Sequence, residues 1–105
     1  MRPQSLTATA LAQNATTAWV PLDIYQTPFN VSLGLVITSG TWDVQHTFEN
    51  VFDSSVTPTA FTHSSLSGET TTIDGNYAFP VTAVRLKQTS ASPGTAVLHI
   101  LQGKG

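Results

Sequence analysis

The chain has 105 residues, of which 40% are apolar and only 10% are charged, and its formal net charge is −2. This length suffices for one compact domain but not for two, and four basic residues are too few to neutralise a run of phosphates, which disfavours direct nucleic-acid binding. The absence of cysteine excludes disulfides and thiolate metal sites, and since no apolar run approaches the length of a bilayer, we expect neither a membrane span nor a signal peptide.

The first segment, residues 1–17, is rich in Ser, Thr, Ala and Gln, and its only substantial apolar side chains are Leu6 and Leu11. Such a segment forms either one short strand or an extended arm that becomes ordered against a partner. We interpret it as an extended N-terminal arm, followed by a β-sandwich domain over residues 18–105. An arm of this kind can add a strand to a neighbour's open sheet edge through backbone hydrogen bonds.

From Trp19 onward, short β-branched and aromatic runs recur at intervals of about eight to twelve residues, broken by Gly, Pro, Asn and Asp. We expect strands at 16–25, 29–38 and 42–49, and Ser39-Gly40 predicts a tight turn that joins the last two as a hairpin. Alternation within 42–49 predicts one wet face and one buried face. The predicted buried face consists of Trp42, Val44, His46 and Phe48.

The second half of the chain predicts further strands at 59–63, 70–73, 77–86 and 96–102. Asp74-Gly75 is typical of a hairpin turn, and Pro80 predicts a break or an edge because proline cannot donate to a sheet ladder. Counted generously, these runs make about eight strands, the number that two packed four-stranded sheets need. The sequence therefore predicts an all-β protein, a two-sheet antiparallel sandwich of jelly-roll type.

Acid–base chemistry at neutral pH would begin with His46, His63 and His99, but they fall in separate segments without metal-ligand spacing. Alternation with apolar neighbours predicts that His46 and His99 are packed in the core, whereas His63 lies among Ser and Thr and is expected to be exposed. A glycosidase-like pair of carboxylates on adjacent strands stays open, although turns and exposed strand faces explain each carboxylate more simply. We expect no enzymatic activity, no catalytic or metal-binding residue and no cofactor.

The aromatic side chains suggest a binding alternative. Trp19, Tyr25, Trp42 and Tyr77 could form a flat platform on which sugar rings or another protein stacks. Against this, Trp42 belongs to the predicted buried face, and Trp19 leads into an apolar run that would anchor the arm to the domain. A carbohydrate-binding module is kept as an alternative function.

Several phrases after the first segment share one overall pattern, namely WVPLDIYQTPFNVSLGLVITSGTWDVQHTFENVFD at Trp19–Asp53, then VTPTAFTH, DGNYAFPVTAVRLKQTS and VLHILQG. This pattern resembles small structural proteins of tailed-bacteriophage virions, which are jelly-roll or related sandwiches that decorate, cement or join parts of the particle. The resemblance carries over no catalytic residues. It implies a homo-oligomeric capsid decoration or cement protein, located on the virion, that binds the major capsid protein or other virion proteins. A head–tail connector or fibre-associated protein is the alternative with the same fold.

A nearly uncharged, Thr-rich surface suits permanent assembly, because many weak contacts repeated by symmetry sum to high avidity. We expect the contacts in the first segment, at Trp19, and in the stretches around 52–57 and 61–67. The expected contact residues are Leu6, Leu11, Trp19, Phe52, Phe61 and His63.

Overall fold

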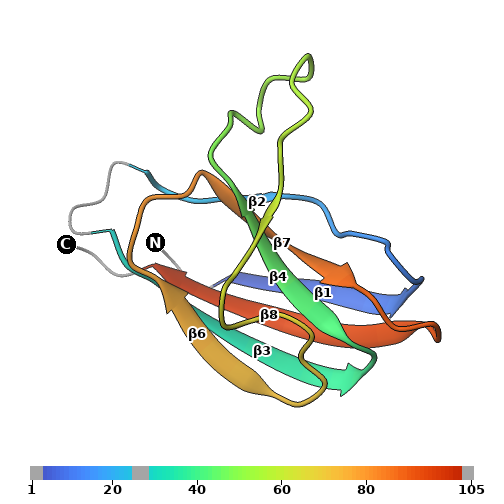
Figure 1. Cartoon of the computed structure of the whole chain (residues 1–105). Helices are drawn as coiled ribbons and strands as arrows, with labels where there is room; N and C mark the ends of the chain where they lie inside the picture. Colours follow the sequence, from blue (N-terminus) through green and yellow to red (C-terminus); the bar gives the residue numbers. More distant parts are fainter. Residues whose placement is uncertain (1–3, 25–28, 103–105) are drawn as a thin grey trace.

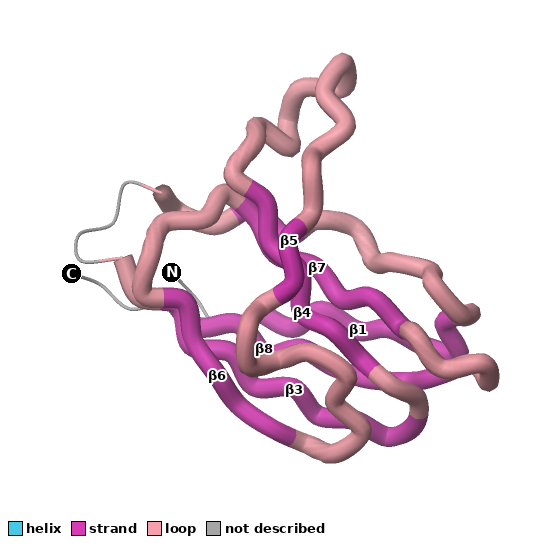
Figure 2. The backbone as a smooth tube through the Cα atoms, in the orientation of Figure 1, coloured by secondary structure: helices cyan, strands magenta, loops and turns pink. Residues whose placement is uncertain are grey.

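The computed structural model describes residues 4–24 and 29–102, and within them the chain forms eight strands and no helix (Figure 1; Figure 2). The strands are β1 (Gln4–Leu11), β2 (Val20–Pro21), β3 (Val31–Ser39), β4 (Trp42–Thr47), β5 (Phe61–Thr62), β6 (Ile73–Tyr77), β7 (Ala83–Gln88) and β8 (Gly94–Gln102). The strands predicted at 16–25 and 59–63 are reduced to the two-residue strands β2 and β5. The described residues contain no helix long and apolar enough to cross a membrane.

The strands form two antiparallel four-stranded sheets, in the orders β1-β8-β3-β6 and β2-β7-β4-β5. Every connection between consecutive strands passes from one sheet to the other, except the connection from β4 to β5. Figure 1 shows β4 and β7 crossing over β3 and β8, as two layers of a sandwich. This is the strand order of a jelly roll, and it confirms the predicted all-β sandwich.

Both predicted hairpin turns are wrong. Ser39-Gly40 joins β3 to β4, but these strands lie in opposite sheets, and β3 pairs with β6 and β8 instead. Asp74-Gly75 lies inside β6, where Gly75 pairs with Leu33. A Cβ atom at Gly75 would stand 3.0 Å from a methyl carbon of the buried Leu66, so this glycine makes room for packing rather than for a turn.

The segment predicted as an arm is, over Gln4–Leu11, the edge strand β1. It pairs with β8, whose outer edge would otherwise leave a row of backbone groups without partners. Ala8 is buried in the core, while Leu6 and Leu11 are partly buried and pack against it. The first segment could form a short strand or an extended arm, and over Gln4–Leu11 it forms the strand. Residues 1–3 lie outside the described residues.

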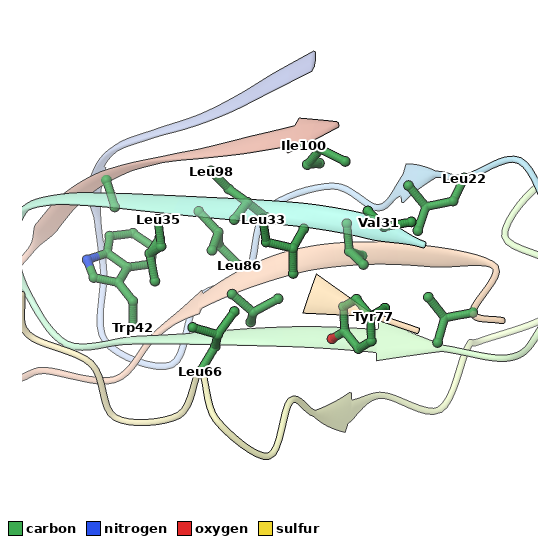
Figure 3. Packing of buried hydrophobic residues seen from close by; sticks show 14 of the residues in the cluster. Leu22, Val31, Leu33, Leu35, Trp42, Leu66, Tyr77, Leu86, Leu98 and Ile100 are labelled. Atoms are coloured by element: carbon green, nitrogen blue, oxygen red, sulfur yellow. The ribbon is translucent and has the colours of Figure 1, made fainter. Parts of the chain in front are cut away.

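Alternate side chains of the strands point between the sheets and form one apolar core (Figure 3). Trp42 is fully buried, and its indole N–H donates a hydrogen bond to the Ser39 carbonyl oxygen at 2.8 Å. In β8 the buried set is Ala96, Leu98 and Ile100, so His99 lies on the exposed outer face. The prediction that His99 is a core histidine is therefore wrong, because the alternation of β8 runs in the opposite register.

One end of the sandwich is closed where the β3–β4 and β7–β8 connections touch. A Cβ atom at Gly94 would lie 2.8 Å from the Ser39 carbonyl oxygen and 2.9 Å from the Gly40 Cα, so the two backbones are in contact. Beside them the fully buried Gln88 donates from Nε2 to the carbonyl oxygen of Leu11 at 2.9 Å. The same amide donates to the carbonyl oxygens of Ser90 and Ser92, and its Oε1 accepts from the Thr41 N–H at 3.5 Å, so one side chain connects the end of β1 to the β3–β4 and β7–β8 connections.

Candidate interaction surface

Three half-exposed phenylalanines gather where β4 ends beside the edge strand β5. Phe48 follows the last residue of β4, Phe61 begins β5, and Phe79 lies in the connection from β6 to β7. They are 52%, 47% and 50% exposed, respectively. The ring centroid of Phe48 lies 5.4 Å from that of Phe61 and 6.4 Å from that of Phe79. We call these three residues the aromatic patch.

The exposure of Phe48 differs from its predicted place on the buried face of the strand. β4 ends at Thr47, so the alternation that buries Trp42 and Val44 no longer controls the next side chain. The predicted wet face is also wrong in part, because Gln45 and Thr47 are buried. The strand end, which periodicity alone does not locate, thus turns an apolar side chain outward.

His46 lies at the centre of the aromatic patch. Its ring stacks on Phe61 with centroids 5.8 Å apart, and it meets Phe48 and Phe79 edge-on at 5.3 and 5.7 Å. The side chain is only 6% exposed, which confirms the predicted packed histidine. Aromatic rings in these offset and edge-to-face arrangements stabilise one another beyond the burial of their area. The three phenylalanine rings of the patch therefore rest on the buried ring of His46.

Tyr77 supports His46 from the core side. The tyrosine ring is fully buried, and its hydroxyl shares a hydrogen bond with Nδ1 of His46 at 2.9 Å. Burial, together with the nearby His63, lowers the pKa of His46, and burial raises the pKa of the Tyr77 phenol. Both groups are thereby held neutral near pH 7, as their place in the apolar interior requires.

His63 is buried, so the prediction that it is exposed is wrong. Its Nε2–H donates to the carbonyl oxygen of Asn76 at 2.8 Å, while Nδ1 accepts from the backbone N–H groups of Ser65 and Leu66 at 3.0 and 3.2 Å. Both ring nitrogens therefore have backbone partners, and these define one tautomer. The imidazole thus links the segment after β5 to β6 by hydrogen bonds, so the role of His63 is structural.

The connection from β4 to β5, residues 48–60, projects from the body of the sandwich (Figure 1; Figure 2). At its base, the Glu49 carboxylate accepts a hydrogen bond from the Thr59 backbone N–H. Further out, the Asn50 side chain accepts from the Phe52 backbone N–H at 2.9 Å. Phe52 itself is 80% exposed. A connection of this length without strands or helices is uncommon in compact domains and often serves binding.

An open hollow of about 570 Å³ lies between this connection and the end of β2. Leu22, Asp23 and Ile24 form one wall, and the other contains Phe48 and Phe52. The remaining lining residues are Asn50, Val51 and Thr82. Because Phe48 belongs to both features, the aromatic patch, the hollow and Phe52 form one continuous surface.

Among the described residues, the charged side chains at this surface are acidic. Asp23 lines the hollow, Glu49 follows Phe48, and Asp53 follows Phe52. Hydrogen bonds from the Ser55 hydroxyl and backbone N–H lower the pKa of the Asp53 carboxyl. The surface therefore favours a partner that brings apolar or cationic groups.

Cationic side chains of the described residues lie elsewhere, on β7. The Arg85 guanidinium carbon is 4.3 Å from the Trp19 ring centroid, and Arg85 Nε donates to Gln45 at 2.9 Å. Lys87 pairs in register with Asp43 of β4. The positive charges thus belong to the outer face of the β2-β7-β4-β5 sheet.

Of the six predicted contact residues, the structure brings only Phe52 and Phe61 to this surface. Leu6 and Leu11 pack on the core, Trp19 is half-buried beneath Arg85, and His63 is buried. The prediction missed the other contributors, Phe48, Phe79 and Ile24. Phe79 stands directly before Pro80, at a predicted break between strands, and that position was the one available signal that its ring is not held on a strand face.

The aromatic platform expected from Trp19, Tyr25, Trp42 and Tyr77 is not formed by the described members of that set, because Trp42 and Tyr77 are fully buried. Tyr25 lies outside the described residues. Among residues 4–24 and 29–102, no three His, Asp or Glu side chains stand close enough to hold a metal ion. Comparison with protein-family models, curated proteins and solved structures finds no match to the chain.

Proposed function

We propose that the chain is a non-enzymatic structural protein of a tailed-bacteriophage particle, a decoration or cement protein that binds the major capsid protein. The observation that carries the proposal is the continuous exposed surface of Phe48, Phe52, Phe61 and Phe79 at one end of the sandwich. A jelly roll with such an end fits the virion proteins that the sequence pattern resembles.

The size of the surface supports a binding role. At roughly 200 Å² for a whole phenylalanine, the exposed fractions of the four rings amount to about 450 Å². That is comparable with the largest apolar patch of a typical monomer, which is often functional. Burying all of it would contribute about 11 kcal/mol before the cost of association, which is of similar size. One copy would therefore bind modestly, and repetition on a symmetric shell would supply the avidity.

To test this, the purified chain is added to phage particles assembled without it, and the amount that sediments together with the particles is measured. We expect saturable binding at a copy number comparable with that of the major capsid protein. The double variant Phe52→Ser/Phe61→Ser should lose most of this binding, because it removes two exposed rings. Its matched control is Val36→Ser/Leu101→Ser, two apolar side chains of 42% and 47% exposure on the outer face of the other sheet. Equal binding by both double variants would refute the proposed surface, provided circular dichroism shows that both are folded.

Copy number separates the main alternative from the proposal. A head–tail connector or fibre-associated protein would be present in a few copies per particle, so mass spectrometry of purified particles distinguishes it from a decoration protein.

A sugar-binding role remains the second alternative, because the hollow combines two phenylalanine rings with Asp23 and Asn50. A glycan array probed with the chain and with Phe52→Ser tests it. Binding of the unmodified chain to a glycan, lost in Phe52→Ser, would favour sugar binding over capsid binding.

A further inference from the structure

β1 and the connection that follows it contain one residue each in the left-handed backbone region. Ala10 has φ of 49° and Asn14 has φ of 63°, and they are the only non-glycine residues with positive φ in the described ranges. Asparagine tolerates this conformation, but alanine is strained by its Cβ atom. Strained short hinges favour the exchange of a terminal element between copies, because exchange lets them straighten.

Beyond the hinge, the chain is firmly attached to β7. Asn14 N–H donates to the Gln88 carbonyl oxygen at 2.7 Å, and Thr17 N–H donates to the Leu86 carbonyl oxygen at 3.0 Å. Leu86 N–H in turn donates to the Thr17 hydroxyl at 3.0 Å. Leu11 is held as well, because it pairs with Gly94 and its carbonyl oxygen accepts from Gln88 Nε2 at 2.9 Å. The gap in the ladder between β1 and β8 is therefore residues 9–10.

β1 buries little side-chain surface before the hinge. Ala8 is its only buried residue, and its ladder with β8 is irregular between Ala8 and Leu11. Within residues 4–8 the hydrogen bond between Ser5 Oγ and His99 Nδ1, 3.1 Å long, is exposed. An edge strand with little buried area opens locally at low free-energy cost.

We infer that residues 4–8 of β1 exchange between two copies of the chain, so that this stretch of each copy pairs with β8 of the other and residues 9–10 serve as the hinge. The ladder of residues 4–8 with β8 is kept in the exchanged dimer, because both copies supply identical strands, and the bond from Ala10 N–H to Thr95 Oγ1 is given up as the hinge straightens. Exchange relaxes the strained hinge of each copy. It also costs the independent motion of one chain, so the fraction of dimer rises with protein concentration. This inference concerns a different surface from the proposed capsid-binding end and does not rest on it.

A cysteine pair reports the exchange directly, because the chain contains no cysteine. Thr7 and Val97 are opposed on β1 and β8, so Thr7→Cys/Val97→Cys places two thiols across this pair of strands. After folding at rising protein concentration and oxidation, we expect a covalent dimer on a non-reducing gel, in increasing proportion. The matched control is Ser32→Cys/Leu101→Cys, which spans β3 and β8 and should yield only monomers. Monomers alone for the first pair, or dimers in equal amount for both, would overturn the inference.

A second measurement needs no cysteine and therefore covers the case in which the cysteine variants do not fold. Sedimentation velocity of the unmodified chain should show a monomer–dimer equilibrium. Ala10→Gly, which removes the strain from the closed hinge, should weaken dimerisation by roughly 25-fold, because a factor of about five applies at each of two hinges. Ala12→Gly, two residues after Ala10 at ordinary φ, is the control and should weaken dimerisation much less than Ala10→Gly does. A chain that stays monomeric at all concentrations, or a dimer that Ala10→Gly leaves unchanged, would overturn the inference.

Discussion

Replacing Gly94 with alanine tests how the end of the sandwich is closed. The added methyl carbon would stand 2.8 Å from the Ser39 carbonyl oxygen, 2.9 Å from the Gly40 Cα and 3.0 Å from the Gln88 Cγ. Two of these atoms are backbone, so they cannot rotate away, and the two connections must separate. Overpacking typically costs 1–3 kcal/mol, and we expect about 3 kcal/mol here, since separation also disturbs the hydrogen bonds of Gln88.

Urea unfolding followed by fluorescence measures this loss, because Trp42 is fully buried and reports the core. The control is Gly34→Ala, where the nearest atom to the new methyl carbon would be 3.8 Å away, at His99 Cβ. Alanine there should be neutral or stabilise the strand by about 0.5–1 kcal/mol. A loss below about 0.5 kcal/mol for Gly94→Ala, or an equal loss for both variants, would show that the backbone contact does not limit packing.

Three further predictions concern the buried polar side chains. Tyr77→Phe should lower the free energy of unfolding by about 1–2 kcal/mol in urea titrations, because it leaves Nδ1 of His46 without its partner; an unchanged midpoint would contradict that bond's role. Since the pKa of His46 is lowered from 6.5 in the folded chain, the unfolded chain binds its proton first as pH falls. Stability should therefore decrease as pH drops below about 6.5, and less so in His46→Gln, as thermal unfolding between pH 7.5 and 5 would reveal. Gln88→Leu should cost about 3 kcal/mol by urea unfolding, because the carbonyl oxygens that accept its amide lose their donor, and a stable variant would mean that water replaces it.

The aromatic patch shows why the site was only partly predictable. Phe52 and Phe61 stand in polar stretches, and this local context is enough to indicate that their rings are exposed. Phe48 belongs to an alternating run and looked buried, because its exposure depends on where β4 stops. His63 sits among polar residues, but its ring finds backbone partners 2 to 13 positions away along the chain, which no local pattern records.

Alternating side chains and frequent turn residues were enough to predict an all-β sandwich of about eight strands, because the period of two is a local property of an extended backbone. They also predicted correctly that Trp42, Val44 and His46 are buried. Which strands pair, and which connections cross between sheets, was decided only in three dimensions. Ser39-Gly40 and Asp74-Gly75 have the same turn chemistry, yet one crosses between sheets and the other lies within a strand. The reason is that pairing depends on which edges and how much core space the rest of the chain leaves, and a short segment contains no record of either.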